Sequence, residues 1–86
     1  MNNILRLLAD PVFVTIWNKY INGTKISRLE LKDIIEGCKV RHDADVLSSG
    51  LSLEDKLKLM EKYSHLADAV NEYTEERLRI EGKLEE

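Results

Sequence analysis

The sequence predicts an all-α fold, a small antiparallel helical bundle or hairpin with a long C-terminal helix. Three observations support it: apolar residues recur at spacings of three and four, capping signals precede each such stretch, and turn residues separate the stretches. The 86 residues have the size of one domain, which we place at residues 1–86. A domain this small buries a limited core, so we expect self-association or a partner protein.

The first helix is predicted over residues 11–21. Asp10 can accept hydrogen bonds from the free amides at its start, and Pro11 suits the first helical position because no N–H is needed there. The apolar stripe consists of Val12, Phe13, Ile16, Trp17, Tyr20 and Ile21. Gly23 then favours the left-handed turn that ends a helix.

The second helix is predicted over residues 28–47 and has the strongest start signal. Ser27 and Glu30 have the spacing of a capping box, in which each side chain bonds a backbone amide of the other residue. Ile26 and Leu31 have the spacing of a hydrophobic staple across the same helix start. These local rules agree on one starting residue.

The third helix is predicted over residues 53–80. Ser52 can cap it, and acidic residues in its first turn complement the helix dipole. The apolar pattern resembles a heptad repeat, with Leu59, Leu66, Tyr73 and Ile80 seven apart and Tyr63, Val70, Arg77 and Leu84 in the alternating position. Fraying of the chain after residue 81, around Gly82, is left open.

Helix lengths predict where the third helix binds a partner. Short connections make neighbouring helices antiparallel, and the third helix outruns the hairpin by about 10 residues. Its first part should belong to the internal core, through Leu59, Tyr63, Leu66 and Val70. Its overhang should lack intramolecular cover and bind another protein through Tyr73, Arg77, Ile80 and Leu84. The alternatives are a frayed tail or a homodimer through the same seam.

The interior of the second helix holds three residues that need an interpretation. Gly37 marks a kink, a close helix crossing or a tolerated weak spot. Cys38 and His42 are four residues apart, as two metal ligands or a thiolate–imidazole pair would be. Because no further ligand has matching spacing, we favour a buried core cysteine.

The remaining motifs argue against an enzyme. The glycines are isolated, so no phosphate-binding loop is predicted. Carboxylates occur in the favourable i, i+4 order with basic residues, as in Glu54 with Lys58 and Glu75 with Arg79, which explains them as helix stabilisers. We therefore predict no catalytic, cofactor-binding or metal-binding residues.

The charge distribution argues against nucleic-acid binding but leaves one alternative. Residues 51–86 hold six basic and ten acidic side chains, a balance of −4 that would repel phosphates. The region 11–47 could form a small helix-turn-helix-like DNA-binding regulator, with Lys25, Arg28 and Lys32 at the start of a recognition helix.

We expect a cytoplasmic protein without a membrane span. The apolar run within residues 1–8 is interrupted by Arg6 and is too short for a signal peptide. A single cysteine favours a reducing compartment.

One long stretch resembles a known family. Residues 26–70 read ISRLELKDIIEGCKVRHDADVLSSGLSLEDKLKLMEKYSHLADAV and follow an Asp10-Pro11-Val12-Phe13 start. Together they resemble the rIII lysis-inhibition accessory proteins of T-even bacteriophages. The resemblance implies a helical cytoplasmic antiholin, which binds the cytoplasmic N-terminal part of the phage holin and delays host lysis. It transfers no binding residues to this chain.

Overall fold

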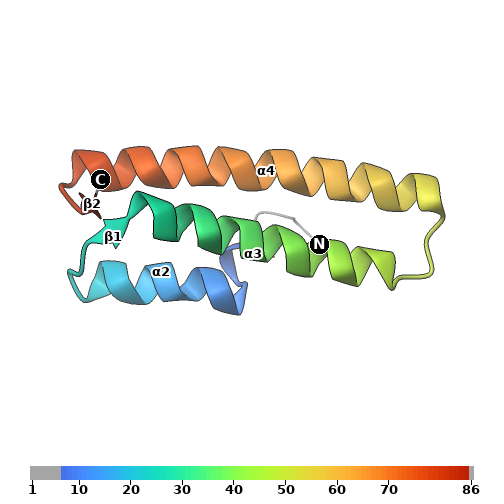
Figure 1. Ribbon diagram of the computed structural model, residues 1–86, viewed down its shortest axis with the longest axis horizontal. Coiled ribbons are helices and arrows are strands. Elements are labelled where there is room, and N and C mark those ends of the chain that lie inside the picture. The colour runs from blue at the N-terminus through green and yellow to red at the C-terminus, as the bar shows by residue number, and fades with distance from the viewer. Residues whose placement is uncertain (1–6, 86) are drawn as a thin grey trace.

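Within residues 7–85, three long helices lie side by side, each antiparallel to the next along the chain, and the predicted all-α class is confirmed (Figure 1). The computed structural model describes residues 7–85, so the apolar run at residues 1–8 lies outside it except for Leu7 and Leu8. The helices are α2 (Pro11–Ile21), α3 (Arg28–Leu47) and α4 (Leu53–Ile80). Helix α3 lies between the other two, and the body measures 44 × 20 × 19 Å (Figure 1). All three helices begin and end where the sequence predicts.

The helix starts use the predicted caps. Asp10 Oδ1 accepts a hydrogen bond from the amide of Val12 at 2.8 Å. Ser52 Oγ accepts one from the amide of Asp55 at 3.2 Å, at the start of α4. Each side chain satisfies an amide that has no partner within the helix.

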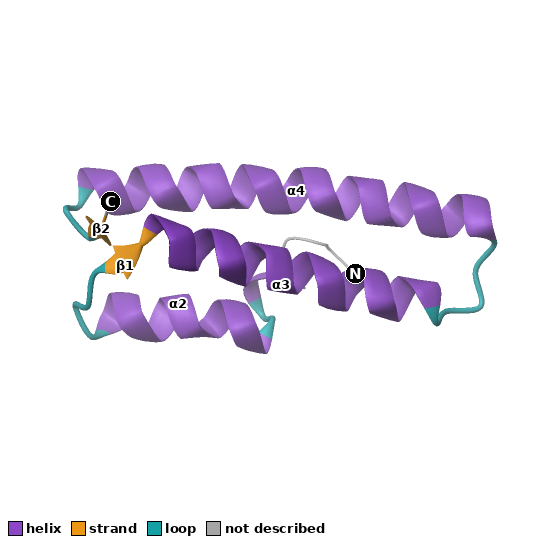
Figure 2. Cartoon of the chain, viewed as in Figure 1, coloured by secondary structure: helices purple, strands orange, loops and turns teal. Residues whose placement is uncertain are grey.

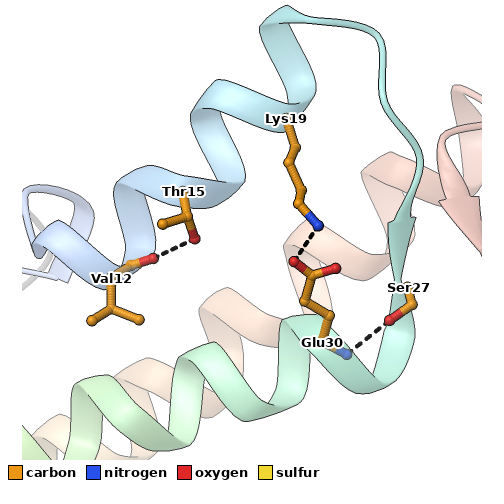
Figure 3. Close-up of polar contacts among 5 residues, drawn as sticks. All are labelled: Val12, Thr15, Lys19, Ser27 and Glu30. Carbon is orange, nitrogen blue, oxygen red and sulfur yellow. Dashed lines mark hydrogen bonds and ion pairs between the residues drawn. The ribbon is translucent and has the colours of Figure 1, made fainter.

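The capping box at the start of α3 forms only in one direction. Ser27 Oγ accepts from the Glu30 amide at 2.9 Å, but the Glu30 carboxylate pairs with Lys19 of α2 (Figure 3). An ion pair between two helices has replaced the second half of the box. The hydrophobic staple is present, since Ile26 and Leu31 are both fully buried in the core.

Helices α2 and α4 are each followed by a glycine and end in the same type of turn. Gly23 and Gly82 have φ values of 73° and 69°, the left-handed region that favours glycine. After α4, the amide of Lys83 donates to the carbonyl of Leu78 at 2.8 Å, and that of Gly82 to Arg79 at 3.1 Å, which is a Schellman motif. The chain therefore turns at Gly82 rather than fraying there.

The turn at Gly82 brings the following residues beside the start of α3, where two very short strands pair. Strand β1 (Ile26–Ser27) and strand β2 (Leu84–Glu85) pair in parallel at the end of the molecule where α2 ends and α3 begins (Figure 2). The amide of Ile26 donates to the carbonyl of Lys83 at 2.9 Å. This pairing was not predicted, because residues almost 60 positions apart carry no local signal for it.

The core lies on the face of α3 that α2 and α4 cover. It consists of Leu7, Phe13, Ile16, Ile26, Leu31, Ile35, Cys38, Tyr63, Ala67 and Leu78. The ring of His42, itself buried, stacks on Tyr63 with centroids 3.8 Å apart. Gly37 faces no close crossing, since an added Cβ there would meet no atom within 4 Å.

The heptad interpretation of α4 is only partly correct. Tyr63 is buried and Val70 packs against the core, but Leu59 and Leu66 are only half-buried. An α-helix drifts by about 20° per heptad relative to a seven-residue repeat, so positions that share a face at residue 59 have rotated away by residue 80. Leu78 has rotated into the core instead.

The expectation that the overhang lacks intramolecular cover is wrong for part of it. Helix α3 begins level with Glu75, whose Oε1 lies 2.5 Å from Nε of Arg28. Beyond that level, Leu78 is buried in the core and Leu84 is half-buried against it, with Leu84 paired to Ile26 of β1. Tyr73 and Ile80 are 70% and 65% exposed.

Candidate protein-binding groove

An apolar groove of about 470 Å³ runs between α2 and α4. It exists because both helices pack on α3 rather than on one another, so the space between them is filled only at its base. Phe13 and Ile16 of α2 and Leu78 of α4 are buried side chains that form its floor. A concave apolar surface of this kind is typical of a binding site.

Aromatic side chains form the two rims. Trp17 on α2 is 44% exposed and packs edge-to-face on Phe13, with ring centroids 5.9 Å apart. Tyr73 on α4 lies on the opposite rim. Exposed Trp and Tyr side chains beside a groove are typical of protein interfaces, where they contribute large apolar area.

The outer face of α2 extends this apolar surface. Val14 and Ile21 are exposed, Ile21 by 77%. The helix contains one charged residue, Lys19, which pairs with Glu30 of α3. A solvent-facing helix side without charge is unusual in a chain of which 34% of the residues are charged.

A polar cluster closes the groove at the C-terminal ends of α2 and α4. The hydroxyl of Tyr20 donates to Glu81 Oε1 at 2.6 Å, and Arg77 Nη2 donates to Glu81 Oε2 at 3.4 Å. The bond from Tyr20 holds the pKa of Glu81 below its usual range and raises the pKa of Tyr20. Lys83 Nζ lies 4.0 Å from the centroid of the Tyr20 ring.

The structure separates the four predicted partner-binding residues. Tyr73 and Arg77 line the groove, Ile80 is exposed outside it, and Leu84 lies in β2 against the core. The α2 wall was missed, because its apolar residues were interpreted as core. The signal that could have revealed this wall is the width of the apolar stripe on α2, whose polar residues are Thr15, Asn18 and Lys19.

Cys38 is fully buried, as predicted, and burial together with the nearby Asp10 carboxylate raises its pKa to about 11. The thiol is therefore protonated near neutral pH and is a poor nucleophile. Between residues 7 and 85, no three His, Cys, Asp or Glu side chains are grouped so that they could hold a metal ion.

The helix-turn-helix alternative loses part of its basic surface. The Arg28 guanidinium pairs with Glu75 of α4, and α3, the helix that would read DNA, lies between α2 and α4 (Figure 1). A recognition helix must project its first turns into the major groove.

Comparison with known proteins adds no relative: no family model matches the chain, and no curated protein or solved structure does so either. None of the helices within residues 7–85 is both long and apolar enough to cross a membrane.

Proposed function

We propose that this chain is a non-enzymatic regulatory protein that binds another protein through the groove between α2 and α4. The observation that carries the proposal is the apolar floor between two exposed aromatic side chains on its rims, Trp17 and Tyr73. An amphipathic helix laid along such a groove would bury its apolar face there. The resemblance to the phage lysis-inhibition proteins suggests the partner: the cytoplasmic N-terminal part of a holin, whose capture would delay lysis.

Binding to a purified N-terminal fragment of a T-even phage holin tests the proposal. Tyr73→Glu places a charge on the groove rim without touching the core, and we expect it to weaken binding at least tenfold, or about 1.4 kcal/mol. Val40→Glu is the matched control, since Val40 is 66% exposed on α3 and does not line the groove. Equal affinity of the two variants would contradict the groove as the binding site.

Self-association through the same surface is the competing outcome. Sedimentation of the wild-type chain and of Tyr73→Glu distinguishes it, because a dimer that buries the groove would dissociate in the variant. Removing the overhang by truncating the chain after Asn71 would test the same surface, but it would also remove the buried Leu78 from the core, so we prefer the substitution.

A further inference from the structure

We propose that the groove selects a helical segment whose apolar stripe ends in a carboxylate, and that Arg77 binds this carboxylate. The inference rests on the proposed function and specifies the chemistry of the partner. It makes Arg77 the specificity-determining residue of the groove.

The length and polarity of the groove set the apolar part of the ligand. Phe13 and Tyr20, which mark its extent along α2, are seven residues apart, or about 10.5 Å along the helix. A ligand helix covers the same length with side chains at positions i, i+3 or i+4, and i+7. Apart from Arg77 and Glu81 the lining holds no charged residue, so a charged ligand side chain placed against the apolar part would lose its hydration without compensation.

The polar end of the groove sets the charge of the ligand. Arg77 and Glu81 are the charged residues among those that line the groove. Both carboxylate oxygens of Glu81 already accept hydrogen bonds, one from Tyr20 and one from Arg77. The Arg77 side chain is 53% exposed, and its contact with Glu81, at 3.4 Å, uses one of its five N–H donors.

This end of the groove therefore has donors to offer, and each oxygen of the Glu81 carboxylate already accepts one hydrogen bond. Lys83, beside Tyr20, adds a second positive charge nearby. A ligand carboxylate can approach the guanidinium with two parallel hydrogen bonds, a geometry that lysine cannot provide. A basic ligand residue at the same place would instead meet Arg77 and Lys83.

Selection from a displayed library of 18-residue helical peptides tests the inference. The library fixes Leu, Ile or Phe at i, i+4 and i+7 and randomises the other positions. We expect the wild-type chain to enrich Asp or Glu at one position, about a turn beyond one end of the stripe. Arg77→Glu should enrich Lys or Arg there. Arg79→Glu, the matched control with the same charge change on a residue that does not line the groove, should keep the acidic preference.

The outcomes separate the two proposals. If no peptide of the library is enriched, or if enriched peptides bind Tyr73→Glu as well as wild type, the groove itself is not the binding site. If stripe peptides bind the groove but show no acidic preference, the role of Arg77 is wrong and the proposed function stands.

A second measurement does not depend on the folding of Arg77→Glu. On the wild-type chain, a selected peptide should bind at least threefold tighter with Glu than with Gln at the selected position in about 50 mM salt. This difference should shrink in about 500 mM salt because of screening. Equal binding of the two peptides at low salt would overturn the inference.

Discussion

At the scale of single residues, the interior of the bundle contains a cysteine and a histidine, residue types that are catalytic or metal-binding in many other proteins. Cys38 is fully buried, and His42 stacks on Tyr63 in the same part of the core. Burial stabilises the neutral thiol over the thiolate, and the Asp10 carboxylate acts in the same direction. Their environment makes these residues packing elements.

Cys38 should therefore be inert until the protein unfolds. With a pKa of about 11 and no exposed surface, the thiol should react with a thiol reagent at pH 7.5 at least 100-fold more slowly in the native protein than in denaturant. Cys38→Ala should cost about 1–2 kcal/mol through lost packing and leave partner binding intact. Rapid native labelling would contradict this description of the core.

At the scale of elements, two glycines have opposite roles. Gly37 lies inside α3 with open space around its Cα, whereas Gly82 adopts φ = 69° in the turn after α4. A helix interior favours alanine over glycine, and a left-handed turn favours glycine over alanine.

The same substitution should then change stability in opposite directions at the two sites. Gly37→Ala should raise the free energy of unfolding by about 0.5–1 kcal/mol, and Gly82→Ala should lower it by about 1 kcal/mol. Urea denaturation followed by circular dichroism measures both, and each variant serves as the control for the other. A lower free energy of unfolding for Gly37→Ala would contradict the prediction, because an alanine side chain at this position would then have to clash with its surroundings.

At the scale of the whole molecule, one cluster of contacts joins the end of α2 to the segment that follows α4. Tyr20 near the end of α2 bonds Glu81 just after α4, and the same region holds the β1–β2 pair. These contacts fix the end of α4 beside α2 and so define the polar end of the groove. The order of this region depends on contacts between distant segments.

The Tyr20–Glu81 bond should give stability a pH dependence. Because the folded-state pKa of Glu81 is lowered, its contribution is present above about pH 4 and is lost as the pH falls through that lowered value. Because the pKa of Tyr20 is raised, its contribution is present below about pH 10 and is lost as the pH rises through the raised value.

Tyr20→Phe keeps the ring under Lys83 and removes only the hydroxyl. Its Tm should be lower than that of wild type between about pH 5 and 9, and the difference should shrink at both extremes. Tyr73→Phe, on the exposed groove rim, is the control and should leave Tm unchanged. A Tm difference for Tyr20→Phe that stays constant across pH would show that the bond to Glu81 contributes nothing.

The sequence by itself determined where the helices begin and end. Asp10, Ser27 and Ser52 cap amides within three residues of themselves, and Gly23 closes the helix that directly precedes it. These signals act over a few positions, so the chain displays them without reference to the rest of the fold. For the same reason the buried position of Cys38, on the apolar stripe of its helix, could be predicted.

Only the tertiary structure decided which residues of α4 face inward and where a partner surface lies. Leu78 is buried and Ile80 is 65% exposed, because the segments packed around the end of α4 cover one side of it and leave the other open. The groove depends on α2 and α4 both packing on α3, and its polar end depends on Tyr20 meeting Glu81, 61 residues later. Contacts over such separations leave no periodic trace in the sequence, because neither segment needs the other to form its own helix.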